Sequence, residues 1–360
     1  MPSLKEMSLR NNSLQEFSHP GEIPSLKELD LSINKLTHLS SSVLLALPSL
    51  TRIDISNNII AELAPNTFTG NKQLQMIDLS YNGLHSVPSQ SFSGLTNLQM
   101  LDLSRNKIEN LGAGVFQDLR RLKSLNVANN RISNVPSDLL MGLTALQHLN
   151  MKANAINFIP ERFFGYTVQL IELNLRSNLI SELGPKVFAS LNALESLALA
   201  SNQIGFFDGS AFDDMPKLRA LDISYNRISD VPAHSFKNLV SLEKFEAREN
   251  KIGNVHDAAF PNTKKLQIVD LAHNDITSVP RLVKKSLSLK VVDLSHNSIV
   301  NIQHEDFNNI EGLVELYLND NKIAQLSTRA FEVYYYKIYG THKLIFAKAR
   351  ACMHENIFCC

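Results

Sequence analysis

The sequence predicts an α/β solenoid, in which about 14 coils stack on one parallel β-sheet. Two features predict it: a repeat with a period of 24 that runs through most of the chain, and an asparagine that recurs at one place in every turn. In the reference turn, Leu98–Arg121, the leucines Leu98, Leu101 and Leu103 are followed by Asn106. A fixed period of this length marks folds in which each unit packs only on its neighbours.

Fourteen such turns follow one another along the chain. They open at Leu4, Leu26, Leu50, Leu74, Leu98, Leu122, Leu146, Leu170, Leu194, Leu218, Leu242, Leu266, Leu289 and Leu313. The spacing is 24 except after Leu4, where it is 22, and after Leu266, where it is 23. The pattern fails after Phe331. We therefore expect a repeat array over residues 1–331 and an irregular tail over residues 332–360.

The leucines of each turn predict a short strand, because L-x-L alternates with a period of two residues. Strands of neighbouring turns then pair in parallel, about 4.8 Å apart. The asparagine that follows can donate and accept hydrogen bonds, so we expect it to satisfy backbone groups at a buried turn. The members of this expected structural ladder are Asn58, Asn82, Asn106, Asn130, Asn154, Asn178, Asn202, Asn226, Asn250, Asn274, Asn297 and Asn321.

A column of phenylalanines predicts a stacked core along the side opposite the strands. Leu44 and Leu140 replace the phenylalanine in two turns, and the turn that opens at Leu266 lacks it, so we expect Leu282 to fill that place. The column is Phe68, Phe92, Phe116, Phe164, Phe188, Phe212, Phe236, Phe260, Phe307 and Phe331.

Residues 332–360 depart from the repeat. A fifteenth turn would open near Lys337, yet the chain there lacks both the leucines and the asparagine. A degenerate cap, a disordered tail and an incorrect gene model each explain this departure, and we favour the last two because the first turn also lacks a cap. We expect residues 340–360 not to form another coil, and the chain to be an internal piece of a longer protein.

Composition excludes several function classes. The chain has 35 basic and 35 acidic residues, so no general attraction to nucleic acid or to a membrane surface follows. There is no apolar run of 18 residues, no signal peptide and no membrane anchor. The cysteines are Cys352, Cys359 and Cys360, outside the array, so they do not report the redox compartment. No cofactor is expected.

The extended repeat is L-x-x-L-x-L-x-x-N-x-I-x-x-V-P-x-x-x-F-x-x-L-x-x, over residues 4 to about 331. It resembles the typical 24-residue class of animal extracellular leucine-rich repeats, as in Toll, Slit and chaoptin. This resemblance implies a right-handed horseshoe with the parallel sheet on its concave face. The chain departs from the class in having no signal peptide, no cysteine-rich caps and no anchor.

Candidate binding residues are those that break the repeat consensus on the concave face. Aspartates between the second and third leucines belong to the consensus, so we interpret them as ordinary surface rather than an acidic binding strip. Three kinds of cluster remain: exposed apolar or aromatic residues, basic pairs expected in adjacent turns, and a second apolar pair. They are Met76, Tyr81 and Met100, then Lys152 with Arg176 and Lys244 with Arg248, and then Ile268 with Val291. Such groups are common at protein interfaces.

His273 and His296 flank the second apolar pair at equivalent positions of consecutive turns. A metal site would need two more ligands, and a pH-sensitive contact is an alternative, but surface histidines are the best interpretation, and no metal is expected. No catalytic constellation occurs, so we do not expect an enzyme. One glycosylation sequon begins at Asn11 beside the asparagine column, and the Cys359–Cys360 ending resembles a prenylation signal.

The leading hypothesis is a non-catalytic recognition module of a cell-surface adhesion molecule or receptor ectodomain. It would bind a protein ligand or a homophilic partner on the concave face, with no nucleic acid and no membrane insertion by this chain. The full-length protein would be extracellular or at the plasma membrane. The alternative is an intracellular leucine-rich repeat scaffold or regulatory subunit. A signal peptide and cysteine-rich caps in the surrounding gene would separate the two.

Overall fold

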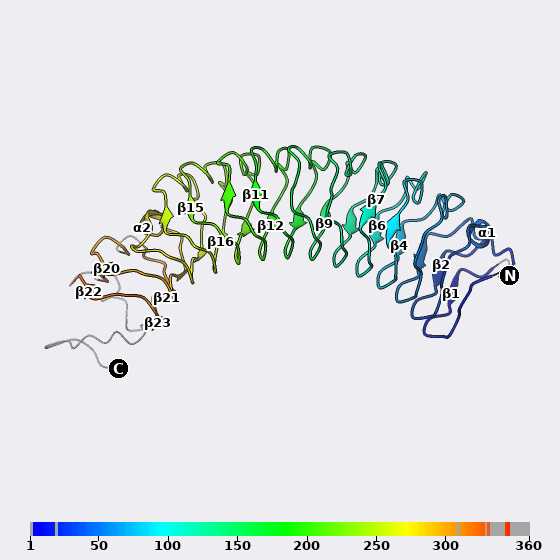
Figure 1. The fold of residues 1–360 in the computed structure, drawn as a ribbon, viewed down its shortest axis with the longest axis horizontal. Coiled ribbons are helices and arrows are strands. Elements are labelled where there is room, and N and C mark those ends of the chain that lie inside the picture. Colours follow the sequence, from blue (N-terminus) through cyan, green and yellow to red (C-terminus); the bar gives the residue numbers. More distant parts are fainter. Residues whose placement is uncertain (1–2, 19–20, 308–309, 328–329, 332–342, 346–360) are drawn as a thin grey trace. The chain divides into compact units, whose positions relative to one another are not determined.

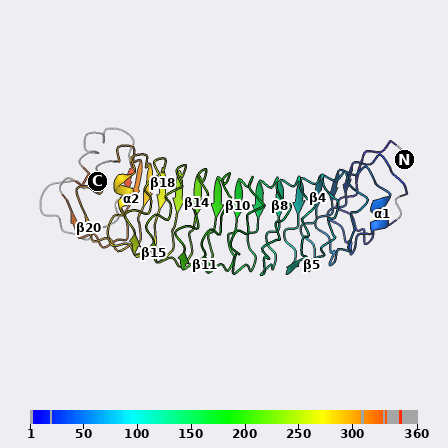
Figure 2. The ribbon, with the colours of Figure 1, turned by 90° about the horizontal axis from the view of Figure 1, so that it is seen from above.

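The computed structural model describes residues 3–18, 21–307, 310–327, 330–331 and 343–345. The chain folds into two compact units, Met1–Leu218 (unit 1) and Arg219–Cys360 (unit 2). Within each unit, coils of the chain stack beside one another with their strands aligned (Figure 1, Figure 2). No helix in the described ranges has the length and apolar character needed to cross a membrane.

Unit 1 is built on short strands that pair in parallel, one from each coil. Every strand begins two residues after an opening leucine, and equivalent residues face one another, as Met76 does Met100. The central residue of each strand from β2 onward is buried. The strands are β1 (Glu6–Ser8), β2 (Glu28–Asp30), β3 (Arg52–Asp54), β4 (Met76–Asp78), β6 (Met100–Asp102), β8 (Ser124–Asn126), β9 (His148–Asn150), β10 (Glu172–Asn174) and β12 (Ser196–Ala198).

Unit 2 repeats this arrangement with parallel pairing throughout. Its strands are β14 (Ala220–Asp222), β16 (Lys244–Glu246), β18 (Ile268–Asp270), β19 (Val291–Asp293), β21 (Glu315–Tyr317) and β23 (Lys343–Ile345). The stacked parallel coils in both units confirm the predicted solenoid class.

Strand β23 shows that one expectation was wrong, because residues 340–360 contain a further parallel strand. Leu344 pairs with Leu316 of β21 in the register of the other strands. The offset between these two leucines is 28, against 24 between paired residues of the regular turns. A search at the fixed period of 24 therefore placed the turn too early, near Lys337. The tail on either side of β23, residues 332–342 and 346–360, lies outside the described residues.

Two-residue strands lie on a second side of the coils. In unit 1, β5 (Ser86–Val87) pairs with β7 (Asn110–Leu111), and β11 (Glu182–Leu183) pairs with β13 (Phe206–Phe207). In unit 2, β15 (Asp230–Val231) pairs with β17 (Asn254–Val255), and β20 (Asn301–Ile302) pairs with β22 (Gln325–Leu326). All of these pairs are parallel, so successive coils keep the same register on this side too.

The asparagine of each coil ties that coil to the preceding one. In unit 1, the Asn106 Nδ2 donates to the backbone oxygens of Leu79 at 2.9 Å, Leu103 at 3.0 Å and Ser104 at 3.3 Å, while its Oδ1 accepts the N–H of Leu84 at 3.0 Å. The pattern recurs at Asn58, Asn82, Asn130, Asn154, Asn178 and Asn202. In unit 2 it recurs at Asn250, Asn274, Asn297 and Asn321, and Asn226 donates within its own turn.

Phenylalanine rings stack from coil to coil inside each unit. Ring centroids lie 6.1 Å apart between Phe68 and Phe92, 5.8 Å between Phe164 and Phe188, and 4.7 Å between Phe236 and Phe260.

Two short helices replace the usual loop. Helix α1 (Ser41–Leu45) buries Leu44, and α2 (Arg281–Lys285) buries Leu282 and Val283 in the turn that lacks a phenylalanine. Both stacked rings and helices keep the coil interior filled.

Candidate functional site

The strand face is the candidate site, and it consists of four positions per coil, the third of which is buried where it is serine or alanine. These are the first and third strand residues and the two residues just before the ladder asparagine; in one coil they are Met100, Asp102, Ser104 and Arg105. The last of the four has a positive φ in every coil, such as 55° at Arg105. This left-handed backbone turns the chain away from the strand and fixes the direction of that side chain.

The acidic column of the strand face has a structural role in both units. In unit 1 the Oδ1 atoms of Asp54, Asp78 and Asp102 accept the backbone N–H two residues later at 2.8–2.9 Å. In unit 2 Asp270 and Asp293 accept in the same way at 3.0 and 2.9 Å. The column holds the turn after the strand, which accounts for aspartate there without any ligand.

Asparagine takes over this role in three coils of unit 1. The side-chain oxygens of Asn126, Asn150 and Asn174 accept the equivalent N–H at 3.1–3.2 Å. An uncharged amide therefore supports the same turn, and the charge of the column varies along the unit without any change of backbone.

The first predicted cluster comes together in unit 1. Met76 and Met100 are register neighbours on β4 and β6, and Met100 and Tyr81 are each 48% exposed. The guanidinium carbon of Arg105 lies 4.8 Å from the centre of the Tyr81 ring, a cation–π contact. Sequence reasoning missed Arg105, although it stands one full period after Tyr81, the offset at which neighbours in adjacent coils are found.

Asp78 lies between Met76 and Tyr81 in the sequence, and its pKa is raised above its usual value of 3.8. Burial of the carboxyl is the main cause; hydrogen bonds from Ser80 oppose it, and the charges of Asp102 and Asp54 add to it. The ionised form of the Asp78 carboxyl is therefore less favourable in the folded protein than in water.

Basic residues of the second predicted group behave differently in the two units. Lys152 and Arg176 of unit 1 are exposed at equivalent places in adjacent coils, as expected. Lys244 and Arg248 of unit 2 were wrongly placed in adjacent turns, because both belong to the coil that opens at Leu242. The Lys244 ammonium lies 2.8 Å from the Glu246 carboxylate, and the Arg248 Nε is buried without a hydrogen bond.

The third predicted group also comes together, in unit 2. Ile268 and Val291 face one another on β18 and β19, and both are half-buried. The rings of His273 and His296 stack, with centroids 3.9 Å apart and planes inclined by 13°. Within the described ranges of the chain, no group of three or more histidine, cysteine, aspartate or glutamate side chains is placed to hold a metal ion.

Each stacked histidine has a carboxylate on its outer side. His273 Nδ1 lies 3.5 Å from the Glu249 carboxylate, and His296 Nε2 lies 3.2 Å from the Asp320 carboxylate. All four residues occupy the positive-φ position of consecutive coils. The sequence contained this signal, because the four stand directly before the ladder asparagines, but the carboxylates were not recognised.

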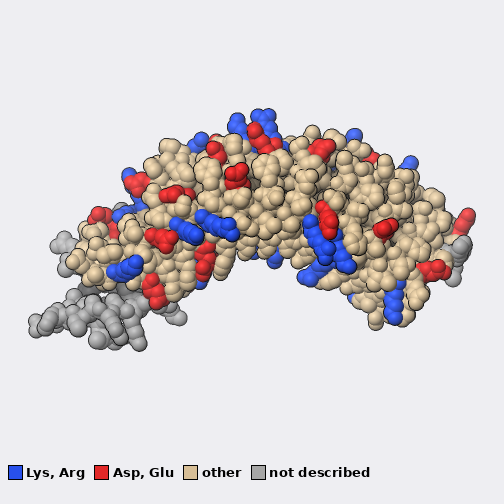
Figure 3. All heavy atoms as spheres, in the orientation of Figure 1, with Lys and Arg blue, Asp and Glu red and all other residues tan. Residues whose placement is uncertain are grey.

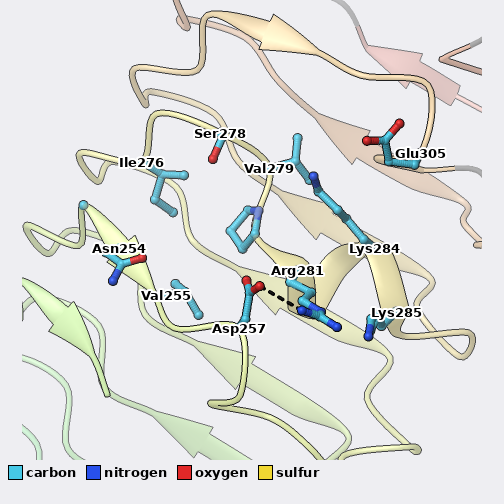
Figure 4. A pocket seen from close by; sticks show the side chains of 12 residues that line it. Asn254, Val255, Asp257, Ile276, Ser278, Val279, Arg281, Lys284, Lys285 and Glu305 are labelled. Carbon is cyan, nitrogen blue, oxygen red and sulfur yellow. Dashed lines mark hydrogen bonds and ion pairs between the residues drawn. The ribbon is translucent and has the colours of Figure 1, made fainter. Parts of the chain in front are cut away.

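A hollow of about 450 Å³ in unit 2 was not predicted (Figure 4). It lies at helix α2, where the turn has lost one residue. Arg281 pairs with Asp257 at 2.9 Å across the hollow, and Lys284 pairs with Asp306 at 2.7 Å. The lining has neither histidine nor cysteine. Elsewhere on the visible surface of each unit, basic and acidic side chains are interspersed (Figure 3).

Comparison with known proteins identifies the repeat. A family model for the leucine-rich repeat matches residues 24–84, 48–108, 77–132, 102–156, 120–170, 152–204, 193–252 and 288–332. No curated protein matches the chain. The matched segments cover most of the residues.

Several solved structures have a similar fold. Toll of Drosophila, solved in its complex with Spatzle, has a TM-score of 0.70 and 22% identity over 84% of this chain and 45% of the Toll chain. A leucine-rich repeat protein of Leptospira interrogans has a TM-score of 0.70 and 22% identity over 95% of this chain and 96% of its own. TLR13, solved with ssRNA13, has a TM-score of 0.67 and 24% identity over 92% of this chain and 56% of its own. This chain thus spans about half the length of Toll, and it is a member of the leucine-rich repeat family.

Proposed function

We propose that this chain is the protein-recognition part of a cell-surface receptor or adhesion molecule, and that it binds its partner on the strand face. The half-buried Met76 and the exposed Met100 on adjacent strands, with the exposed Tyr81 just after the first of these strands, carry this proposal. The backbones of the two methionines are held by parallel pairing on both sides, so little entropy is lost when a partner contacts them. Aromatic residues and methionine are enriched in protein interfaces.

A protein partner is favoured over nucleic acid by the charges of the face. TLR13 was solved with RNA, whereas Toll was solved with the protein Spatzle. Here three carboxylates, Asp54, Asp78 and Asp102, lie on neighbouring strands beside the methionines. A phosphate backbone would be repelled by this row, and the chain has no excess of basic residues to compensate.

An alanine scan of the strand face tests the proposal. Met76, Tyr81, Met100, Arg176 and Arg248 are replaced one at a time, and binding is measured to a protein captured from native cell surfaces. Loss of one true anchor is expected to cost about 2 kcal/mol, or roughly thirty-fold in Kd. Ser80→Ala and Ser104→Ala are the controls, since these serines hold the same position in their coils as Arg176 and Arg248 but are buried.

The scan has a clear negative result. If all five variants bind like the two serine controls, the partner does not use the strand face and the proposal fails. Labelling the native protein with a membrane-impermeant reagent on intact cells tests the location separately, because an intracellular scaffold would stay unlabelled. Sedimentation of the purified chain identifies a homophilic partner as a concentration-dependent dimer.

A further inference from the structure

One patch of unit 1 has the chemistry to select a particular kind of partner segment. The methionine–aspartate patch consists of Met76 and Met100 together with Asp54, Asp78 and Asp102. Met76 is the first residue of β4 and Asp78 the third, and Met100 and Asp102 hold the same places in β6. Two rows therefore run across the strands, one apolar and one acidic, because equivalent residues pair in register.

The apolar row is open to solvent. Met100 is 48% exposed and Met76 is half-buried, and the flanking first-position residues, Arg52 on β3 and Ser124 on β8, are polar. The row is thus a two-residue apolar island. Methionine has three rotatable bonds and a polarisable sulfur, so such a pair can adapt its shape to a large apolar side chain.

The acidic row has no cation paired with it in the described part of the chain. The Oδ1 atoms hold the backbone turns at 2.8–2.9 Å, and Asp102 Oδ2 also accepts the Asn126 amide at 2.9 Å. Among the residues that the structure describes, no lysine or arginine forms an ion pair with Asp54, Asp78 or Asp102. Arg105 lies over the Tyr81 ring instead. An incoming cation would relieve the mutual repulsion of these partly buried carboxylates.

We infer that this patch receives an extended partner segment with a large apolar side chain and, two residues away, a lysine or arginine. The inference rests on the proposed function. The first and third residues of a strand are about 6.6 Å apart and project to one side. A partner segment aligned with β4 and β6 has the same spacing, so its apolar side chain would meet Met76 and Met100 while its cation meets Asp78 and Asp102.

Peptide binding to the full chain tests this inference. Three short labelled peptides are compared by fluorescence anisotropy: one with a Leu-Thr-Lys repeat, one with Leu-Thr-Glu and one with Ser-Thr-Lys. The first is expected to bind at least about tenfold more tightly than either of the others, since it alone has both features. Equal binding of the Lys and Glu peptides, or no binding of the first, would overturn the inference.

Two charge variants locate the contact. Asp78→Asn combined with Asp102→Asn removes the two carboxylates that the partner's cation would meet, and Asn126 shows that an asparagine supports the same turn. The matched control is Asp30→Asn with Asp222→Asn, which removes equal charge from the same column in strands whose first residues, Glu28 and Ala220, are not large apolar side chains. Only the first pair is expected to weaken the Leu-Thr-Lys peptide, by about tenfold; equal loss in both pairs would mean general charge attraction and would refute the site.

The outcomes separate this inference from the proposed function. If Met76 and Met100 are anchors for the native partner but the Asp78–Asp102 variant binds that partner as wild type does, the strand face is used and the apolar-x-basic segment is wrong. If no strand-face variant affects the native partner, the proposed function itself fails.

Discussion

The ladder asparagine satisfies backbone groups from two coils with one side chain. Asn154 Nδ2 donates to Val127 O at 3.0 Å, in the preceding coil, and to Met151 O at 3.1 Å, in its own. Its Oδ1 accepts the Ile132 N–H at 3.1 Å. These groups are buried, so water cannot replace the amide when it is removed. An apolar residue at this position would therefore leave buried backbone groups without a hydrogen-bond partner and would lower the stability of the fold severely.

Replacing Asn154 by Leu is expected to lower the free energy of unfolding by about 3–5 kcal/mol, because a buried donor and several carbonyls lose their partner. Urea denaturation measures the change. Asn12→Leu is the matched control: Asn12 occupies the same place in the first turn but is exposed, and among the described residues it bonds only to Leu9 and Arg10 of its own turn. An equal loss in both variants would contradict the account of the cross-coil bonds.

Ionisation of Asp78 is expected to reduce stability at neutral pH. Its folded-state pKa lies above the unfolded value of 3.8, so the folded state binds the proton more tightly and loses stability as the pH rises through the folded-state pKa. Asp78→Asn should therefore unfold at a higher urea concentration near pH 7. This gain should shrink as the pH falls toward 3.8, because the wild-type carboxyl is then protonated.

Asp208 supplies the comparison of opposite sign. Its pKa is lowered, first by the hydrogen bond from the Ser210 side chain and then by that from the Ser210 backbone. This stabilisation is present above 3.8 and is lost as the pH falls through the lower folded-state pKa. Asp208→Asn should therefore destabilise the protein near pH 7. A shift of the same sign in both variants would show that the charge of Asp78 is not the cause.

At the level of elements, the short strands could be predicted because the leucines and the asparagine that specify them recur in every turn. The spacing of leucine and asparagine determines where each strand lies and how it pairs. Residues that face one another on neighbouring coils are one repeat period apart in the sequence, as Met76 and Met100 are. Strand β23 was not predicted because its offset from β21 is 28 residues rather than 24. Where the period holds, the same rule would have found Arg105 beside Tyr81 and Glu249 beside His273.

Helix α2 was not predictable in this way, because its contacts depend on a local departure from the repeat. The turn at Leu266 is one residue short and lacks a phenylalanine, and the chain forms a five-residue helix there. Its Lys284 reaches Asp306, which belongs to the next coil and is only 2% exposed. No periodic signal links these two residues, and the hollow beside them follows from the same irregular loop.

The two ion pairs of α2 should differ greatly in their effect on stability. Lys284→Ala leaves the buried Asp306 carboxylate without its cation, and a loss of about 3 kcal/mol is expected. Arg281→Ala removes a pair whose side chains are largely exposed, and a loss below about 1 kcal/mol is expected. Thermal unfolding of the two variants measures both. Similar melting temperatures would show that Asp306 does not depend on Lys284.

At the scale of the whole molecule, stability should be a sum over coils and the contacts between neighbouring coils. All three cysteines lie in the last nine residues, so no disulfide joins distant parts of the array. A coil can then be removed as a unit if the flanking coils fit one another. Residues 122–145 form one full period of the repeat inside unit 1.

Deleting residues 122–145 should give a folded, shorter protein. Leu146 then follows Arg121, Asn154 Nδ2 meets the Leu103 carbonyl that now accepts from Asn130, and Phe116 faces Phe164. The expected result is an unchanged β-type circular dichroism spectrum, monomeric elution, and a smaller urea m-value because less surface is exposed on unfolding.

Deleting residues 122–133, half a period, should cause aggregation, since the later leucines of unit 1 lose register with the earlier ones. If both deletions aggregate, the coils of unit 1 are not interchangeable and stability is not a sum over neighbours.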